Sequence, residues 1–220
     1  MKKVLLLISA FLLAFQISKA QTEKGSQTLG VNVSFHSQKS SNVINDPNSG
    51  SSYNLNSKSS SFGIGPSYSY FIANKLDIGV NLGYDHMSNT NSQGSSPYRS
   101  RQYDYSAQLF LRKYFMYTDK IGLRAGPYVG YGKYNTKNTY SDPNQASDTY
   151  KSDNYSAGAN LALVYYPSRN IGISASLANI AYQHSKGNDE SPNNYSTNTF
   201  DASFISSNVG LSLFYVFGAK

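Results

Sequence analysis

Residues 121–134 read IGLRAGPYVGYGKY. From Ile121 to Tyr131 the odd positions are apolar or aromatic, whereas the even positions hold glycine apart from Arg124 and Tyr128. Alternation with a period of two is typical of a β-strand, because successive side chains of a strand point to opposite faces. We therefore predict a strand with one continuously apolar face and one small or polar face.

The same alternation occurs in seven other segments. The predicted strands are residues 27–37, 59–71, 76–86, 101–115, 121–134, 152–166, 171–182 and a last strand that ends at Phe217. The last strand has a break in phase, because apolar residues occupy even positions in 200–204 and odd positions from Val209 onward. Either a β-bulge near residues 206–208 or a long loop that joins the strand at about Ile205 would explain this break.

The connections between the predicted strands alternate in length. Short connections lie at Ala73–Lys75, Met116–Lys120 and Pro167–Asn170, and long ones lie near residues 38–58, 87–100, 135–151 and 183–197. Short periplasmic turns that alternate with long outer loops are typical of an up-and-down barrel in a bacterial outer membrane. Aromatic residues near the ends of the apolar stripes fit the girdles found at membrane interfaces. With four long and three short connections, both termini are expected on the periplasmic side.

Residues 1–20 are expected to be a signal peptide that is removed. Lys2 and Lys3 precede the apolar run Val4–Phe15, and Ser18 and Ala20 are the small residues of a cleavage site. The barrel domain then comprises residues 21–220, and losing three lysines lowers the formal charge from +7 to +4. This charge is small and scattered, which argues against nucleic-acid binding. The chain has no cysteine and, after residue 20, no apolar stretch long enough for a membrane helix.

Four segments resemble a known group of proteins. They are Gly63–Tyr70 (GIGPSYSY), Leu111–Phe115 (LRKYF), Gly122–Gly132 (GLRAGPYVGYG) and Leu211–Phe217 (LSLFYVF). They are similar to the small eight-stranded outer-membrane barrels of the OmpA/OmpX-like superfamily, in the form found in Bacteroidota. The resemblance implies an all-β, eight-stranded antiparallel up-and-down transmembrane β-barrel in the outer membrane of a Gram-negative bacterium, with surface-exposed loops.

The resemblance also implies an assembly signal at the end of the last strand. In such barrels the final strand ends in an aromatic residue that resembles a signal for the barrel-assembly machinery. Tyr215 and Phe217 are the aromatic residues at this place in the chain. Three further residues, Gly218–Lys220, follow Phe217, which is a departure from the usual pattern.

Three charged residues are predicted to lie inside the barrel. Asp77, Arg112 and Arg124 fall on inward positions of neighbouring strands, at similar depth near the end with the short turns. Buried charges need partners, so we expect a salt-bridged cluster that closes the lumen. Because eight strands leave an interior just wide enough for side chains, a wide pore is excluded. The cluster could be a gate, or it could only fill and orient the interior.

Basic residues beside the long connections share the lipid-facing parity of their strands. They are Lys39, Lys58, Arg99, Arg101, Lys133, Lys137 and Lys151, whereas Lys186 has the opposite parity. Such residues could bind lipopolysaccharide phosphates through charge-assisted hydrogen bonds. The alternative is that they are solvated loop charges, since parity fades beyond the end of a strand.

Catalytic and metal-binding patterns are weak. His36, His86 and His184 lie on separate strands, with His36 and His184 on inward parity and His86 on outward parity, so they do not converge as metal ligands would. His86 and Ser88 share a face, but no third group is placed to orient the histidine. Gly126, Gly130 and Gly132 precede no helix and form no phosphate-binding loop. We expect no catalytic residue, cofactor or metal.

The sequence therefore favours a non-enzymatic integral outer-membrane protein with surface-exposed loops and a structural, adhesion or interaction role. The alternatives are a narrow gated channel or transporter for small or apolar solutes, and an outer-membrane acyl hydrolase that modifies lipid. The expected partners are membrane lipid and lipopolysaccharide, the barrel-assembly machinery during insertion, and an extracellular ligand that the sequence does not identify. A monomer is the expected state, and nucleic acid is not an expected partner.

Overall fold

A computed structural model describes residues 21–45, 52–93, 98–142, 145–188, 195–204 and 211–218. All its regular elements are strands, and every neighbouring pair is antiparallel, which confirms the predicted all-β class. The strands are β1 (Gln27–Asn45), β2 (Ser52–Ala73), β3 (Leu76–Gln93), β4 (Tyr98–Met116), β5 (Ile121–Tyr140), β6 (Asp148–Tyr165), β7 (Ile171–Asn188), β8 (Tyr195–Phe204) and β9 (Leu211–Phe217). The described residues include no helix that is long and apolar enough to cross a membrane.

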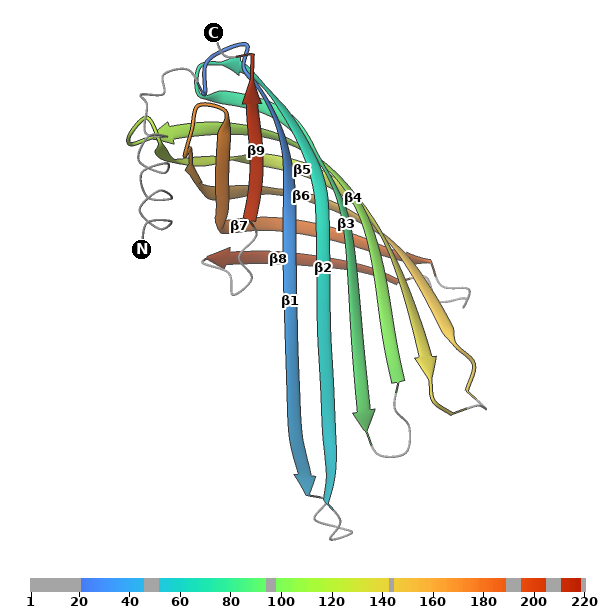
Figure 1. The fold of residues 1–220 in the computed structure, drawn as a ribbon. Helices are drawn as coiled ribbons and strands as arrows, with labels where there is room; N and C mark the ends of the chain where they lie inside the picture. The colour runs from blue at the N-terminus through green and yellow to red at the C-terminus, as the bar shows by residue number, and fades with distance from the viewer. Residues whose placement is uncertain are drawn as a thin grey trace, which may run out of the picture.

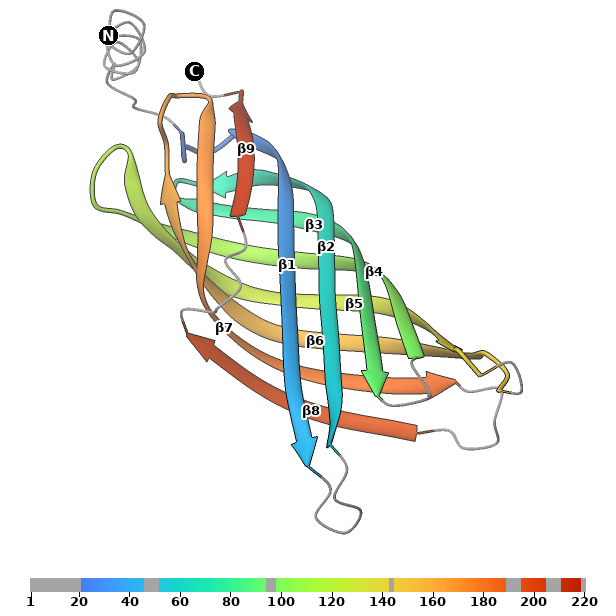
Figure 2. The same cartoon turned by 60° about the horizontal axis from the view of Figure 1, so that its bottom comes forward.

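The strands close into an up-and-down barrel (Figure 1). Strands β1 to β7 pair in chain order, and β9 pairs with both β7 and β1, which completes the ring. β8 and β9 are two segments of the predicted eighth strand, since both pair with β7. Figure 2 shows β8 running beside β7. In the described ranges, β1 pairs with β9 only over Gln27–Val33 and has no contact with β8.

The two ends of the barrel differ. Three short connections join β2 to β3, β4 to β5 and β6 to β7, as predicted, and β1 begins and β9 ends at this same end. We call it the turn end, and we call the opposite end the hairpin end. The first turn is so tight that Lys75 adopts a positive φ of 62°.

The prediction of long loops at the hairpin end is largely wrong. Most of residues 38–58, 87–100, 135–151 and 183–197 are paired strand. These Ser/Asn/Thr-rich stretches lack an apolar stripe, but backbone pairing begun by the apolar half of each hairpin continues through them. Strands β1 to β7 are therefore 18 to 22 residues long, about twice the 9–11 residues that a transmembrane strand needs.

The outward face carries an apolar band between two rows of aromatic residues. Leu29, Ile78, Leu109 and Leu213 are among its exposed side chains. The row toward the turn end contains Tyr70, Phe115, Tyr165 and Tyr215, and the row toward the hairpin end contains Tyr84, Tyr105, Tyr131 and Tyr155. The rows lie ten positions apart on β4 and on β6, which matches the thickness of a bilayer core crossed by tilted strands. We take the segments between these rows as the membrane-spanning part.

A bulge at Leu177 changes the phase of β7. Leu161 pairs with Ala178 and Ala162 pairs with Ser176, so Leu177 has no partner on β6. The inward parity predicted for His184 is wrong for this reason, because His184 pairs with the outward Tyr155. Lys186 likewise pairs with Asp153 on the outward face. A single extra residue moves all following side chains to the other face.

The structure also tests the two explanations for the break in phase of the last strand. β8 is a strand over Tyr195–Phe204, so the alternative of a long loop reaching Ile205 is wrong. Ala178 pairs with Phe204 and Ala175 pairs with Leu211, which places the irregularity between these two pairs. The predicted bulge near 206–208 lies outside the described residues.

The densest packing lies inside the turn end. A cluster of buried side chains fills the lumen there: Phe71, Tyr114, Val164, Tyr166, Phe214 and Val216. Tyr166 packs edge-on against Phe214 with ring centroids 5.6 Å apart, and Phe71 packs against Tyr114 at 5.3 Å. These residues come from β2, β4, β9 and the end of β6, so this aromatic plug ties the ring together across its interior.

Candidate functional site

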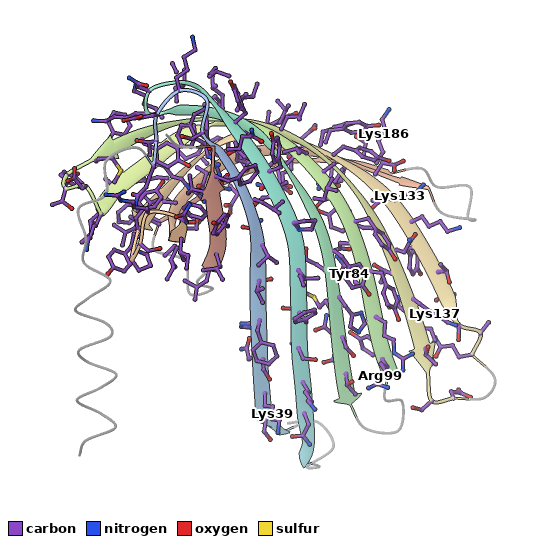
Figure 3. All side chains as sticks on the ribbon, turned by 45° about the horizontal axis from the view of Figure 1, so that its top comes forward. Lys39, Tyr84, Arg99, Lys133, Lys137 and Lys186 are labelled. Atoms are coloured by element: carbon purple, nitrogen blue, oxygen red, sulfur yellow. The ribbon has the colours of Figure 1, made fainter. Side chains whose placement is uncertain are left out.

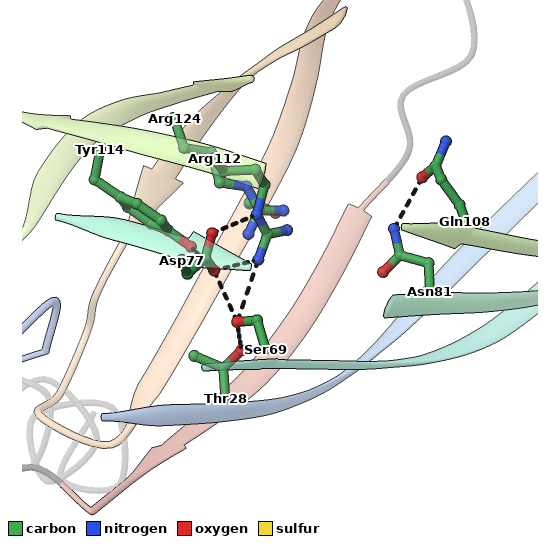
Figure 4. Close-up of polar contacts among 9 residues, drawn as sticks. Thr28, Ser69, Asp77, Asn81, Gln108, Arg112, Tyr114 and Arg124 are labelled. Atoms are coloured by element: carbon green, nitrogen blue, oxygen red, sulfur yellow. Dashed lines mark hydrogen bonds and ion pairs between the residues drawn. The ribbon is translucent and has the colours of Figure 1, made fainter. Parts of the chain in front are cut away.

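Asp77 and Arg112 form an ion pair at the plug, with the Asp77 side chain fully buried and the Arg112 side chain 13% exposed (Figure 4). They are directly opposite each other on β3 and β4. Arg112 Nε donates to Asp77 Oδ1 at 3.0 Å, and Nη2 donates to Oδ2 at 2.6 Å. Such two-point pairing of a guanidinium with a carboxylate is strong and directional. The structure therefore brings together two of the three interior charges that the sequence singled out.

Hydroxyl groups satisfy the remaining capacity of the Asp77 carboxylate. The Ser69 hydroxyl donates to Oδ2 at 2.7 Å, and the Tyr114 hydroxyl donates to the same oxygen at 3.1 Å. Thr28 extends the network, because its hydroxyl lies 2.6 Å from that of Ser69. Asp77 is 0% exposed. Arg112 and these hydroxyl donors compensate the cost of burying its charge.

Arg124 lies in the same region but not in the ion pair. Its Nη2 donates to the Ser174 hydroxyl at 2.7 Å, and Tyr114 is a second hydrogen-bonding neighbour. No carboxylate of the described residues lies within ion-pair distance of Arg124. Its Nε has no hydrogen-bond partner although it is buried. The predicted cluster is thus an Asp77–Arg112 pair with a second guanidinium beside it.

A polar chamber of about 410 Å³ lies above the plug, toward the hairpin end. Arg112, Arg124 and Phe110 line its floor, and the Arg112 guanidinium stacks on the Phe110 ring at 3.7 Å. Amides line the middle: Asn81 donates to Gln108 at 3.1 Å, and Asn160 donates to Ser176 at 3.0 Å. Glycines on β2, β3 and β5 also line this space, on the inward face that their parity predicted.

Two aspartates face each other inside the hairpin end. Asp85 and Asp104 are directly opposite on β3 and β4, one position beyond the aromatic row. Burial raises the pKa of Asp104 to about 6, and the charge of Asp85 adds to this shift while a hydrogen bond from Gln102 opposes it. Burial also raises the pKa of Asp85, against a hydrogen bond from Ser34. This end of the lumen is therefore acidic, whereas the floor is basic.

Basic side chains lie in cross-strand positions on the outward face of the hairpin end (Figure 3). Lys39 is directly opposite Lys58, and Lys58 is opposite Thr90 on β3. Ser41, Asn56 and these three residues line a shallow groove of about 400 Å³. Arg101 is likewise opposite Lys137. Like charges directly opposite each other destabilise a sheet unless an anion lies between them.

The other predicted basic residues are more dispersed. Arg99 is opposite Thr90 and Thr139, and Lys151 is opposite Asn135. Lys133 is opposite Asp153 and therefore already has an acidic neighbour. The geometry thus gathers Lys39 with Lys58 and Arg101 with Lys137, and leaves the remaining residues spread over β4 to β6.

A family model for the outer membrane protein beta-barrel domain matches residues 6–212. The chain belongs to this family. Its members lie in the outer membrane of Gram-negative bacteria, so the apolar band between the aromatic rows is the lipid-facing surface of an outer membrane barrel.

Solved structures of similar outer membrane proteins cover most of the chain at low identity. OprG from Pseudomonas aeruginosa is 15% identical, covers 91% of this chain and 100% of its own, and has a TM-score of 0.45. Ail, the attachment invasion locus protein of Yersinia pestis, is 14% identical over 89% and 100%, with a TM-score of 0.36. The outer membrane protease OmpT from Escherichia coli is 11% identical over 91% and 97%, with a TM-score of 0.39. No curated protein matches the chain.

In this outer membrane barrel, His86 contacts an aromatic ring and a backbone carbonyl group. His86 stacks on Tyr103 at 4.8 Å, and its Nδ1 lies 3.2 Å from the carbonyl oxygen of Gln102. Ser88 is opposite Arg101, and no hydrogen bond links it to His86 in the described part of the chain. Within those same residues, no three His, Asp or Glu side chains are arranged to hold a metal ion.

The aromatic residues at the end of β9 lie on the turn end of the outer membrane barrel. Tyr215 is opposite Leu29 and Ile171 and is 52% exposed on the lipid-facing side. Phe217 is opposite Gln27, the first residue of β1. Both therefore lie at the seam where the first and last strands close the ring.

Sequence reasoning missed several residues of the interior. Ser69, Thr28 and Tyr114 complete the shell around Asp77, and Asp85 faces Asp104. Inward parity could have identified all of them as interior residues. Their pairing depends on the register between strands, which alternation within one strand does not give.

Proposed function

We propose that this outer membrane barrel is a non-enzymatic surface protein that contacts an extracellular ligand through its projecting hairpins. In this proposal the turn end and both termini face the periplasm, and the hairpin end faces outward. The observation that carries it is the length of the strands: at 18 to 22 residues they run well past the aromatic row. A rigid paired surface then stands beyond the membrane, rich in Tyr, Ser and Asn, which suit recognition surfaces.

The β1 edge is the most suitable point of contact. Beyond Val33, the described strands pair with β1 only along its β2 edge. A strand edge that no neighbouring strand covers offers unpaired backbone groups. Phe35 on β1 is 74% exposed, and Phe200 and Phe204 on β8 are 70% and 73% exposed. An extended polypeptide segment could pair with this edge while the aromatic rings supply apolar contact.

The experiment compares two shortened hairpins in whole cells. In the test variant, residues 40–57 are replaced by Asn-Gly, which removes the projecting part of β1 and β2. In the control variant, residues 138–148 are replaced in the same way, because β5 and β6 have both edges paired. We expect attachment to immobilised basement-membrane extract to fall at least tenfold in the test variant and less than twofold in the control. Equal attachment of both variants, or none above cells without the protein, would refute the proposal.

The buried plug supports a closed lumen and argues against the alternative of a channel. Phe71, Tyr114, Val164 and Tyr166 occupy the turn end with almost no exposed area, so a solute in the chamber has no path beyond it without rearrangement. In planar lipid bilayers we expect the wild-type protein to give no conductance. Steps of conductance that grow in Arg124→Ala would favour a gated channel instead.

The surroundings of His86 support a non-enzymatic role. A serine hydrolase needs a histidine within hydrogen-bond reach of its nucleophile, whereas His86 points to a backbone carbonyl and an aromatic ring. We expect identical phospholipid and lipid A profiles in cells with and without the protein. A change in either profile that disappears in His86→Ala would contradict this part of the proposal.

Two partners follow from the surface of the barrel. The opposed pairs Lys39–Lys58 and Arg101–Lys137 suit lipopolysaccharide phosphates, because a bridging anion would relieve their repulsion. Arg99, Lys133 and Lys151 would be outlying contacts. Tyr215 and Phe217, at the closing seam, are the residues proposed for contact with the barrel-assembly machinery during insertion.

A further inference from the structure

The charges at the floor of the chamber do not balance. Two guanidinium groups, those of Arg112 and Arg124, share this region with a single carboxylate, that of Asp77. Arg112 uses its Nε and Nη2 to hold both oxygens of that carboxylate. A buried charge without an opposite partner is strongly unfavourable, so the remaining positive charge favours the binding of an anion.

The Arg124 guanidinium has no carboxylate partner among the described residues. Arg124 is 9% exposed, and in the described part of the chain its donors have Ser174 and Tyr114 as neighbours, with the Phe214 ring centroid 5.6 Å from the guanidinium carbon. Both of these neighbours are neutral hydroxyl groups, and among the described residues Nε, which is itself buried, has no hydrogen-bond partner. Arg112 indicates what a guanidinium in this setting binds when a partner is present: a carboxylate.

The chamber that Arg124 lines has room and chemistry for a small polar molecule. Its volume of about 410 Å³ is within the range of ligand-binding cavities. Above the floor the lining is polar, with Asn81, Gln108 and Asn160 offering amides and Tyr128 offering a hydroxyl. Asp85 is an acidic lining residue farther toward the hairpin end. The amides and the hydroxyl suit a ligand that carries several hydroxyl or amide groups.

We propose that the lumen is a binding site for a small hydrophilic carboxylate, such as a sugar acid, whose carboxylate pairs with Arg124 and whose polar body contacts the chamber amides. The site is closed toward the turn end by the aromatic plug, so the ligand enters from the hairpin end and leaves by the same way. This role is separate from the surface contacts proposed above.

The acidic pair nearer the hairpin end does not cancel this attraction. Asp104 lies eight positions from Arg112 along β4, a distance of about 26 Å at the usual rise of a strand. Asp85 itself lines the hairpin side of the same chamber, so an anion from outside passes it before it reaches the floor. A ligand must therefore place its carboxylate at Arg124 and uncharged groups toward Asp85.

The test uses the full mature protein refolded in detergent micelles, with sodium gluconate as the probe. Sorbitol is the uncharged counterpart, and sodium chloride at equal ionic strength controls for simple anions. We expect gluconate to bind with a millimolar dissociation constant and to move the Arg124 Nε–H signal in nitrogen-15 NMR spectra. Sorbitol and chloride should leave the signal in place. Equal shifts with chloride and gluconate, or no shift with gluconate, would overturn the proposal.

Substitutions of Arg124 test whether this residue binds the carboxylate of the ligand. Arg124→Gln should weaken gluconate binding at least tenfold, and Arg124→Lys should weaken it less because the charge remains. Lys24→Gln removes a positive charge from an exposed position outside the chamber and should change binding less than twofold. If Arg124→Gln does not refold, Arg124→Lys and the wild-type NMR experiment still decide. The proposal would be overturned if Arg124→Lys bound gluconate as tightly as the wild type and gluconate also left the Arg124 Nε–H signal of the wild type in place.

Discussion

Strand β3 carries one aspartate into each end of the barrel, and the two have opposite surroundings. Asp77, at the turn end, receives hydrogen bonds from an arginine, a serine and a tyrosine. Asp85, at the hairpin end, faces another aspartate across the strand pair. The two residues lie on the same strand and the same inward face, so position in the barrel, and not residue type or parity, sets their environment.

The difference follows from access to water. The turn end is filled with aromatic side chains, and in such a place a charge is tolerated only when it is paired and hydrogen-bonded. The hairpin end is half-exposed, where water screens the repulsion between two carboxylates and protonation can remove it. Contacts at the turn end therefore stabilise the fold, whereas the hairpin end tolerates two carboxylates that face each other. Four predictions test this contrast, from the largest effect to the smallest.

Removing Asp77 should have the largest effect. Asp77→Ala leaves Arg112 buried without its partner, which costs about 3–5 kcal/mol. The free energy of unfolding in urea, measured in detergent micelles, should fall by that amount. Asp85→Ala is the matched control on the same strand, and it should be neutral or slightly stabilising because it removes a like-charge contact. Equal losses in the two variants would show that the two ends do not differ.

Two glycines on β5 test the packing at two depths of the lumen. A Cβ atom at Gly126 would overlap the backbone carbonyl oxygen of Leu111, whereas a Cβ at Gly132, nearer the hairpin end, would meet its nearest atom at 3.4 Å. Gly126→Ala should therefore destabilise the barrel by about 1–3 kcal/mol. Gly132→Ala should change stability by less than about 0.5 kcal/mol. The measurement is the temperature at which each variant loses its heat-modifiable band on gels, and a reversed order would contradict the packing described here.

The acidic pair should make stability depend on pH. The pKa of Asp104 is about 6 in the folded protein against an ordinary value of 3.8, so the folded state binds the proton more tightly than the unfolded state. Stability should then rise as the pH falls from 8 through 6 toward 4. Asp104→Asn should stabilise the protein by about 1 kcal/mol at pH 8, after allowance for its half-exposed position. The gain should vanish near pH 4, and an equal gain at both pH values would refute the assignment.

The outward lysines should give the smallest effect. Lys39→Gln combined with Lys58→Gln should weaken lipopolysaccharide binding about two- to fivefold, because exposed ion pairs contribute about 1 kcal/mol or less. Lys24→Gln, which removes an exposed lysine at the turn end, should have no effect. Thermal stabilisation by added lipopolysaccharide reports the difference. Equal sensitivity of the two ends would argue against a phosphate site on the hairpin end.

Much of the interior could be predicted because parity is a local property. Alternation placed Asp77, Arg112 and Arg124 inside the barrel at a common depth. The structure puts Asp77 and Arg112 in contact and leaves Arg124 with Ser174 on β7. That choice depends on the direction in which each side chain extends across the lumen, which no pattern along one strand contains.

The errors have equally physical causes. The polar hairpins resemble loops in composition because no core or lipid selects apolar residues there, although their backbones still pair. The parity of His184 failed because one bulged residue, Leu177, reverses the face of everything after it. A bulge leaves no apolar signature when small residues such as Ala175, Ser176 and Ala178 surround it.

The sequence by itself determined the up-and-down order of the strands, the lipid-facing side of most of them and the short turns that join them, because these follow from alternation and from turn residues. The tertiary structure decided which charges are paired, where the lumen is closed and on which face the residues after Leu177 lie. These properties depend on register and closure, which bring together residues far apart in the chain.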